Sequence, residues 1–122
     1  MPAAHPLTAK EKVTLADLAS EPFVLLDEGE QSLVLDAFAT HGLSPHVTSE
    51  VTDDYTIMAM VEEGLGLSML SRRPVEGMRA DICVRPIAHA PSRDVVAAWR
   101  SWDTMPIATR CFIDYMSSHI VN

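Results

Sequence analysis

Between residues 14 and 71 the sequence alternates segments of helical periodicity with short apolar runs, and this alternation limits the folds that the chain can adopt. Helices are predicted near residues 14–20, 30–41 and 53–64, and a run with strand character follows each of them: "PFVLLD", "SPHVTSEV" and "LGLSMLS". Strands that alternate with helices favour a parallel sheet covered on both faces. The predicted fold class is therefore α/β, with this region as a parallel three-layer α/β lobe.

Local signals mark the ends of these elements. Thr14, with Asp17 three residues later, has the pattern of a capping box, in which each side chain bonds a free backbone amide at the helix start. Gly42 and Gly64 follow predicted helices, where a residue able to adopt positive φ is favoured. Gly66 lies in the same stretch, "MVEEGLGLSMLSRR", and we expect it to let the chain pack closely as it enters the buried strand beneath the helix. This stretch therefore predicts a helix-to-strand turn.

The sequence changes character after Arg73. A loop is predicted for "RRPVEGMRA", a short strand for "DICVRPI", a polar connector for "AHAPSR" and a further strand for "RDVVAAWR". Pro106 then begins a long helix, because proline is favoured at the first helical position. The apolar face of this helix is predicted to carry Ala108, Cys111, Phe112, Tyr115 and His119.

Lysine and arginine are missing from the whole stretch between Val13 and Ser71, which carries eleven aspartates and glutamates. Such a stretch should repel a phosphate backbone, so no direct contact of this chain with nucleic acid is expected. The acidic excess is interpreted as a solvated surface in preference to a cation site.

At 122 residues the chain has room for one compact domain. It contains no apolar run of the length that a membrane span requires, and its first twelve residues lack the apolar middle of a signal peptide. No membrane association is therefore predicted, and a cytoplasmic location is expected.

Metal and thiol chemistry have little support in the sequence. Cys83 and Cys111 lie far apart and outside any CxxC pattern, so buried, unreactive thiols are expected. A glycine and a proline interrupt the helical spacing that would direct His41 and His46 at one ion. No cofactor is predicted, and a metal site is rejected for His5, His41, His46 and His89.

Catalysis is not indicated either. Ser68 lies in "GLGLSML", which lacks the glycine pattern of a nucleophile elbow, and no histidine and aspartate follow it in a recognisable arrangement. No phosphate-binding loop is visible. Ser68 is interpreted as a serine of a buried strand, and the chain is predicted not to be an enzyme.

Several segments, in a fixed order, resemble one known family. They are "HPLTAKEKVTLADLASEPFVLL", "SPHVTSEVTDDYTIMAMVEEGLGLSMLSRR", "VRPI" with "PSRDVVAAW", and "PIATRCFIDYM". Together they look like the effector-binding domain of LysR-type transcriptional regulators, from His5 to about residue 120. The most specific part is "MVEEGLGLSML", followed at the right distance by "RPI" and "SRDVVAAW".

In that family a winged helix-turn-helix binds DNA, a linker helix dimerises, and a two-lobed domain like a type 2 periplasmic binding protein holds a small effector between its lobes. The resemblance implies that residues 5–89 are the second lobe. Residues 90–122 would be a crossover strand and C-terminal helix that return to a first lobe absent from this chain. Met105 departs from the family pattern, in which a serine usually caps the last helix, and Thr104 is the expected substitute.

In open parallel sheets ligands gather beyond the carboxyl ends of the strands, where loops and helix amino termini meet. Here those ends follow "PFVLL" and "PHVTS", and the resemblance places both near the cleft between the lobes. The predicted effector-binding residues are Glu28, Gly29, Glu30, Thr48, Glu50, Thr52 and Asp53.

The chemistry of this site leaves alternatives open. Backbone amides at residues 29–31 could hold an effector carboxylate. Alternatively the effector is neutral or cationic, because Glu28 and Glu30 already supply negative charge. Helix capping alone would explain each carboxylate equally well.

The resemblance therefore implies a small-molecule effector-sensing module of a LysR-type regulator, which controls transcription through a DNA-binding domain not present in this chain. A stand-alone solute-binding domain of the same fold is the alternative, for which a signal peptide would be expected, and a small α/β enzyme is a third. A homodimer or higher oligomer is expected, because a strand and helix without their first lobe would expose apolar side chains and unpaired backbone groups.

Overall fold

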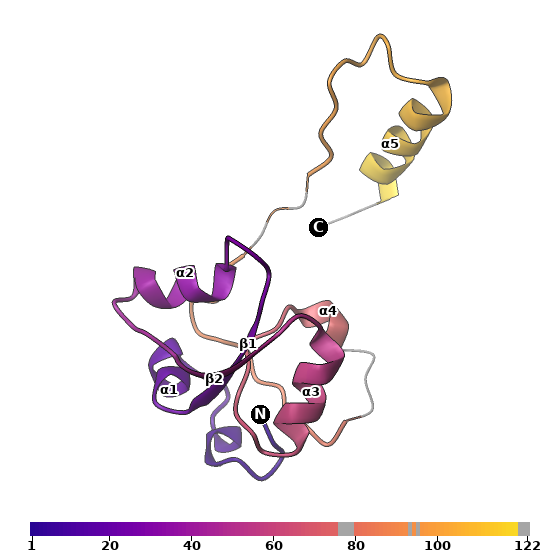
Figure 1. Cartoon of the computed structure of the whole chain (residues 1–122). Coiled ribbons are helices and arrows are strands. Elements are labelled where there is room, and N and C mark those ends of the chain that lie inside the picture. The colour runs from indigo at the N-terminus through magenta and orange to yellow at the C-terminus, as the bar shows by residue number, and fades with distance from the viewer. Residues whose placement is uncertain (76–79, 93, 95, 120–122) are drawn as a thin grey trace. The chain divides into compact units, whose positions relative to one another are not determined.

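The computed structural model describes residues 1–75, 80–92, 94 and 96–119. The chain divides into two compact units, Met1–Pro91 and Ser92–Asn122, and each is considered by itself (Figure 1). Among the described residues, no helix is both long and apolar enough to cross a membrane.

The described part of the first unit contains helices and two strands, which alternate between residues 15 and 62. They are η1 (a 3-10 helix, Pro6–Ala9), α1 (Leu15–Ala19), β1 (Pro22–Leu26), α2 (Leu33–Thr40), β2 (His46–Val51), α3 (Asp54–Glu62) and α4 (Arg72–Val75). The three predicted helices and the first two predicted strands are confirmed. α2 begins at Leu33 rather than at Glu30, because Ser32 caps it by accepting a hydrogen bond from the Leu35 amide.

The predicted capping box holds the start of α1. The Thr14 hydroxyl oxygen accepts a hydrogen bond from the Asp17 amide at 3.2 Å, and the Asp17 carboxylate accepts one from the Thr14 amide at 2.9 Å. The Lys10 ammonium donates to the same carboxylate at 2.7 Å. The bond from Lys10, and then those from Thr14, lower the pKa of Asp17 from 3.8 to about 2.

Because folding lowers the pKa of Asp17, its ionised carboxylate stabilises the fold above about pH 4, and this contribution is lost as the pH falls toward 2. We expect Asp17→Asn to lower the free energy of unfolding by about 1 kcal/mol near neutral pH, after allowance for solvent screening. Near pH 2 the difference from the wild type should largely disappear. Urea denaturation at both pH values measures it, and a difference that does not change with pH would contradict the assignment.

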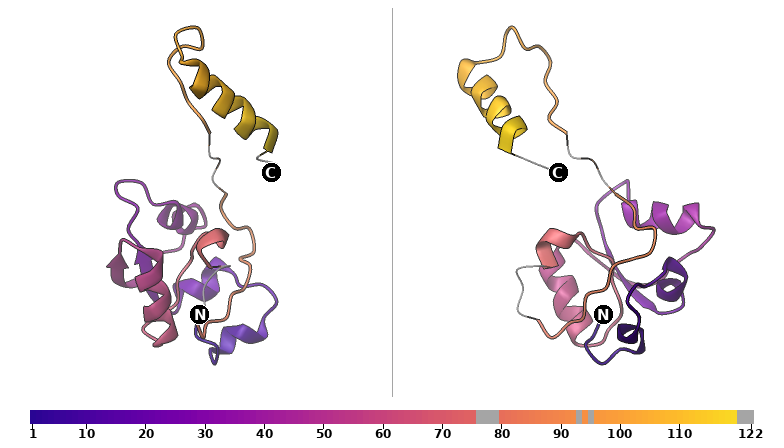
Figure 2. Two further views of the ribbon diagram at one scale, coloured as in Figure 1. Left: turned by 90° about the vertical axis from the view of Figure 1, so that its right-hand side faces the viewer. Right: turned by 180° about the vertical axis from the view of Figure 1, so that it is seen from behind.

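β1 and β2 pair in parallel, as predicted. In Figure 1, α1 and α2 lie on one side of the strands and α3 lies on the other, and the view from behind in Figure 2 agrees. Phe23 and Leu25 belong to one core cluster and Val24 to another, because successive side chains of a strand point to opposite faces. β1 is therefore buried on both faces, as its unbroken apolar run predicted.

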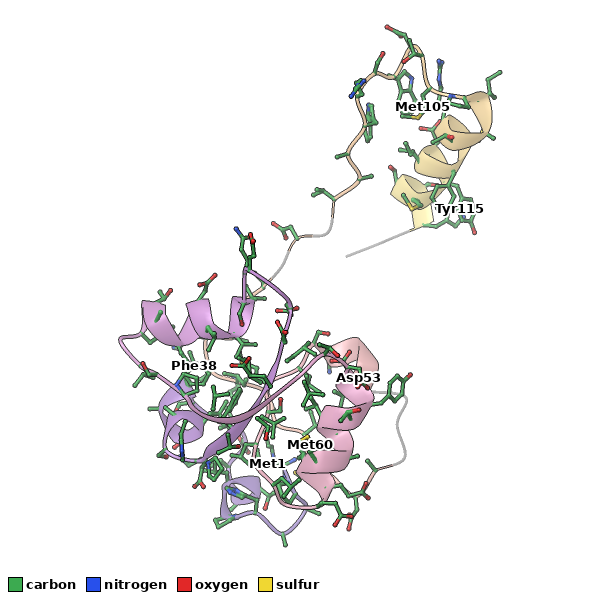
Figure 3. The ribbon with its side chains drawn as sticks, in the orientation of Figure 1. Met1, Phe38, Asp53, Met60, Met105 and Tyr115 are labelled. Carbon is green, nitrogen blue, oxygen red and sulfur yellow. The ribbon has the colours of Figure 1, made fainter. Side chains whose placement is uncertain are left out.

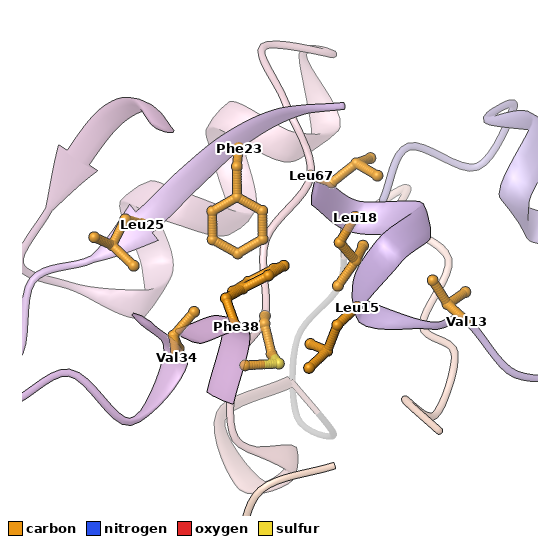
Figure 4. Packing of buried hydrophobic residues seen from close by; sticks show 9 residues of the cluster. Val13, Leu15, Leu18, Phe23, Leu25, Val34, Phe38 and Leu67 are labelled. Atoms are coloured by element: carbon orange, nitrogen blue, oxygen red, sulfur yellow. The ribbon is translucent and has the colours of Figure 1, made fainter. Parts of the chain in front are cut away.

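The larger core cluster joins α1, α2 and β1 (Figure 4). Phe23 and Phe38 are fully buried and pack edge to face, with ring centroids 5.6 Å apart and an interplanar angle of 83°. Around this pair lie Val13, Leu15, Leu18, Leu25, Val34, Leu67 and Met69. The second cluster buries Val24 with Ile57 and Val61 of α3. β1 thus connects the helices on its two sides.

The third predicted strand, "LGLSMLS", is reduced to a single parallel bridge between Phe23 and Leu67. The Val24 amide donates to the Leu67 carbonyl, and the Leu67 amide donates to the Pro22 carbonyl, each at 2.8 Å. One residue later the Ser68 hydroxyl donates to the Val24 carbonyl at 2.7 Å. In a regular ladder the Val24 carbonyl would accept a hydrogen bond from the next backbone amide after Leu67. The Ser68 hydroxyl binds this carbonyl instead, so the regular pairing with β1 stops here. The sheet of the described residues is narrower than predicted.

The two glycines that join α3 to this segment serve different purposes. Gly64 adopts a φ of +77°, which ends the helix in the way that was predicted. Gly66 lies so close to β1 that a Cβ atom would be 2.8 Å from the Pro22 carbonyl oxygen and 3.2 Å from Val24 Cγ2. The predicted close approach is therefore confirmed, and the close neighbour is β1 rather than the helix.

Two further predictions for the first unit were wrong. Residues 81–87, predicted as a strand, make only isolated bridges, such as that of Ile87 with Val13. The Arg85 guanidinium donates to the carbonyls of residues 8 and 10, at 2.9 and 3.0 Å, so a side chain binds the backbone where a ladder was expected. Arg72–Val75, predicted as part of a loop, form α4, and residues 76–79 lie outside the described residues.

The second unit consists of an irregular segment and α5 (Ile107–His119). Pro106, not Thr104, directly precedes the first helical residue, and its carbonyl accepts hydrogen bonds from the amides of residues 109 and 110. The predicted strand is wrong for residues 94 and 96–100, which are irregular, while residues 93 and 95 lie outside the described residues. A strand needs a partner for its backbone groups, and no described residue of this unit supplies one.

Large apolar side chains of the second unit are exposed. Val96 is 80% exposed, Phe112 59% and Tyr115 60%, and no described residue of α5 is buried. Trp99 and Trp102 pack with ring centroids 5.6 Å apart, and the Arg110 guanidinium lies 5.9 Å from the Trp102 ring. This unit therefore has small local contacts but no buried core among its described residues.

Candidate functional site

The carboxyl ends of β1 and β2 lie side by side. The Asp27 amide, directly after β1, donates to the carbonyl of Val51, the last residue of β2, at 2.8 Å. Each strand leads through a short loop into the amino terminus of a helix, α2 or α3. Figure 3 shows Asp53 at the start of α3. The predicted loop residues therefore meet at one place, the carboxyl edge, which we define as residues 27–32 and 50–54.

The loop after β1 is shaped by its own side chains. The Gly29 amide donates to Asp27 Oδ1 at 2.9 Å, and Gly29 adopts a φ of +89°. Glu28 and Glu30, on either side, are exposed. Because Asp27 already occupies the Gly29 amide, an effector carboxylate would have to find its donors elsewhere in this loop.

Asp53 acts as the N-cap of α3. Its Oδ1 accepts a hydrogen bond from the Thr56 amide at 2.9 Å. Hydrogen bonds from the Thr56 side chain, and then from its amide, lower the pKa of Asp53, so the carboxylate is ionised at neutral pH. Thr52 beside it is exposed. The sequence left the cap of this helix open between Thr52 and Asp53, and the structure has Asp53 in that role, whereas an effector contact of either residue stays a prediction.

The two predicted residues of β2 differ in their contacts. The Thr48 hydroxyl donates to the Phe23 carbonyl across the sheet at 3.3 Å. Glu50 pairs with Leu25, and both Thr48 and Glu50 are exposed. Thr48 therefore has a structural partner in β1, and Glu50 presents its carboxylate to solvent.

The parallel direction predicted for "LGLSMLS" agrees with the bridge between Phe23 and Leu67. Sequence reasoning missed one feature of this region. Asp54 Oδ1 is a buried atom without a hydrogen-bond partner among the described residues. No sequence signal distinguished Asp54 from its neighbour Asp53.

The histidines of the first unit have separate surroundings. His5 Nδ1 accepts from the Leu7 amide at 3.2 Å, and His41 Nδ1 lies 2.9 Å from the Ala37 carbonyl oxygen. His46 begins β2, and His89 adopts a φ of +56°. Over the described ranges, no three side chains of His, Cys, Asp or Glu gather so that they could hold a metal ion.

A small cavity lies elsewhere in the first unit. Its volume is about 90 Å³, and its lining includes Met58, Met69, Ile82 and Cys83 but none of the seven predicted effector-binding residues. Sites for small organic ligands usually measure about 300 to 1,000 Å³. This cavity is therefore too small for a metabolite-sized effector. An open pocket of about 330 Å³ lined by residues 8–11 and 84–86 includes none of the seven predicted residues either.

Comparison with known proteins identifies the family. The family model described as LysR substrate binding domain matches residues 1–120. The chain belongs to this family.

Two solved structures of the family have similar folds. The C-terminal domain of a probable LysR family transcriptional regulator from Rhodococcus sp. RHA1 has a TM-score of 0.79 and 34% identity, over 96% of this chain and 60% of that one. HinK from Pseudomonas aeruginosa, a LysR family transcriptional regulator, has a TM-score of 0.82 and 26% identity, over 98% and 43%.

Two proteins of similar sequence are named as transcriptional regulators. The HTH-type transcriptional regulator YvbU of Bacillus subtilis (strain 168), itself described as uncharacterized, is 33% identical over 112 residues, which is 90% of this chain and 38% of that protein. The HTH-type transcriptional regulator CatR of Pseudomonas putida is 31% identical over 116 residues, or 91% and 40%. The chain thus spans about two fifths of the length of these relatives.

Proposed function

We propose that this chain is the effector-sensing part of a LysR-type transcriptional regulator. A small metabolite binds at the carboxyl edge and changes how a separate domain of the regulator binds DNA. The observation that carries the proposal is the bond between Asp27 and Val51, which brings the carboxyl ends of two parallel strands and two helix amino termini together. Membership of the LysR substrate binding domain family supports the regulatory role. In this role the chain is not a catalyst, acts in the cytoplasm and makes no contact with DNA itself.

The proposal includes an assignment of lobes. Residues 5–89 are the second lobe, a three-layer α/β structure, and residues 90–122 return to the first lobe. Burial of β1 on both faces supports the layered arrangement. The change of contacts after Pro91 supports a division close to that position.

Substitutions of Asp53 test the site, because capping and charge can be separated there. Asparagine caps a helix as well as aspartate does, so Asp53→Asn should keep the free energy of unfolding within about 0.5 kcal/mol, whereas Asp53→Ala should lower it by about 1 kcal/mol. If the Asp53 carboxylate meets the effector, Asp53→Asn should still weaken effector binding about tenfold.

The measurement uses the intact regulator, with the effector concentration that gives half of the DNA-binding response as the readout. Thr40→Ala, on the last turn of α2 and away from the carboxyl edge, is the matched control. An unchanged effector response in Asp53→Asn would remove Asp53 from the site. Unchanged responses in Asp53→Asn, Glu50→Ala and Glu30→Ala together would refute the carboxyl edge as the effector site.

The exposed side chains of α5 predict association of the isolated chain. Phe112 and Tyr115 are each more than half exposed, and apolar groups of this size associate when no other surface covers them. We expect a homodimer or higher oligomer, with a mass at least twice the 13.4 kDa of one chain, by light scattering at tens of micromolar. Phe112→Ser with Tyr115→Ser should shift the mass toward one chain. A wild-type chain that stays at 13.4 kDa would contradict this prediction.

A further inference from the structure

β2 has one residue more than β1 along their paired length. Phe23 pairs with Val47, but the next residue of β1, Val24, pairs with Ser49. Thr48 therefore has no partner in the ladder. One extra residue in one strand of a pair is a β-bulge, which re-aims the side chains that follow it.

The packing of β2 shows the same bulge independently of the pairing. Val47 packs against the core cluster of Phe23, whereas Val51 packs against the cluster of Val24 on the other face. Residues four positions apart share a face in a regular strand. The faces of β2 are therefore exchanged between Val47 and Val51, as a single inserted residue requires.

The exchange decides where Glu50 lies. Glu50 pairs with Leu25 and so lies on the face of the larger core cluster, where it is exposed. If β2 continued in step from Val47 without a bulge, Glu50 would pair with Leu26 instead and lie on the face of the fully buried Ile57. A carboxylate on that face would lose water without gaining a partner, which is unfavourable. The bulge thus keeps the Glu50 carboxylate in solvent at the carboxyl edge.

Thr48 holds the bulge against β1. Its hydroxyl donates to the Phe23 carbonyl at 3.3 Å, in the gap that the missing ladder pair leaves. The hydroxyl proton is therefore committed to the sheet, and a ligand at the edge would have to compete for it.

We propose that Thr48 is a positioning residue, which holds the bulge that directs Glu50 to the carboxyl edge, and that Glu50 is the residue of β2 that contacts the effector. The inference rests on the proposed function, because it takes the carboxyl edge as the effector site. Of the two predicted binding residues of β2, Glu50 thus contacts the effector and Thr48 positions Glu50.

The bulge is tested first in the 122-residue chain without any effector. Nuclear Overhauser contacts should connect the backbone of Val24 with that of Ser49. The side chain of Val51 should show such contacts with the second core cluster, which contains Ile57. Glu50 side-chain signals of the wild type should be attenuated by the soluble radical TEMPOL. Thr48→Val lacks the hydroxyl that binds the Phe23 carbonyl, so the contact of Val24 with Ser49 and the attenuation of Glu50 should both weaken, whereas Thr48→Ser should keep both. Backbone contacts of Val24 with Thr48 in the wild type, or protection of Glu50 from TEMPOL, would overturn the inference.

Binding is tested next in the intact regulator, with the metabolite that stabilises it most in a thermal-shift panel as the probe. We expect Glu50→Ala to weaken binding about tenfold or more and Thr48→Val to weaken it only about threefold. Thr48→Ser, which keeps the hydroxyl, should bind like the wild type. Thr48→Val that costs as much as Glu50→Ala would overturn the positioning role of Thr48, and an unaffected Glu50→Ala would overturn the contact role of Glu50. If no metabolite of the panel stabilises the regulator, the proposed function is refuted. The bulge is tested independently of this result, by the Overhauser contacts between Val24 and Ser49 in the 122-residue chain.

Discussion

Gly66→Ala is expected to lower the free energy of unfolding by about 2 to 3 kcal/mol. The added methyl group would lie 2.8 Å from the Pro22 carbonyl oxygen, a backbone atom that cannot rotate away. Relief requires β1 and the segment after Gly66 to move apart, which strains the 2.8 Å hydrogen bond from the Leu67 amide to the same carbonyl. Urea denaturation of the chain near neutral pH measures the loss.

The matched controls are Gly42→Ala and Gly64→Ala. Both glycines have positive φ, +67° and +77°, but no atom lies within 4 Å of the position that a Cβ would take. These substitutions carry only the backbone penalty of the left-handed region, about 1 kcal/mol. A Gly66→Ala variant as stable as Gly64→Ala would show that β1 is not so close to Gly66.

Phe38→Ala should have the largest effect on stability, a loss of about 3 to 5 kcal/mol. Phe38 is completely buried, and its ring packs edge to face on Phe23, so the substitution leaves a cavity between α2 and β1. A domain of this size is typically stable by about 5 to 15 kcal/mol in total. The variant is therefore expected to be close to unfolding at room temperature, which thermal denaturation followed by circular dichroism detects.

Leu35→Ala on the same helix serves as the comparison. Leu35 is 38% exposed and lies outside both core clusters, so its truncation should cost less than about 1 kcal/mol. Equal losses for Phe38→Ala and Leu35→Ala would mean that α2 is not packed on β1 through Phe38.

Much of the first unit could be predicted because its signals are local. The capping box of Thr14 and Asp17, the cap at Asp53 and the positive φ of Gly64 depend on residues a few positions apart, and each is present in the structure. The buried strand "PFVLL" was also recognisable, since an apolar run with no polar face must be covered on both sides.

The predicted strands that failed depend on partners far away in the chain. An apolar run indicates that a segment is buried but not whether it pairs with a strand, so "LGLSMLS" predicts a strand. In the structure the Ser68 hydroxyl binds the carbonyl of Val24, 44 residues earlier, and ends the ladder there. The strand predicted for residues 93–100 is irregular at residues 94 and 96–100 for a similar reason, because the described residues of the second unit offer no partner strand. Tertiary contacts decide such cases, and the sequence does not display them.

The location of the candidate site followed from a topological rule, whereas the roles of its residues did not. Two parallel strands were enough to place their carboxyl ends together, and the bond from Asp27 to Val51 agrees. The alternation in "HVTSEV" concealed the bulge at Thr48, because a bulge is visible only against the partner strand. The effector contacts themselves stay predictions, which the substitutions at Asp53 and Glu50 test.

The hydrogen bonds of Arg85 have a consequence for the order in which the first unit folds. They join carbonyls that lie 75 and 77 residues earlier in the chain, so they close a loop that contains nearly the whole unit. The entropy cost of closure rises with loop length, and contacts between distant residues slow folding. During synthesis, α1, β1, α2 and β2 all leave the ribosome before Arg85 does. The segment before α1 therefore gains these hydrogen bonds only after nearly the whole unit has been synthesised, and the same holds for the Val13 backbone, whose partners are residues 86 and 88.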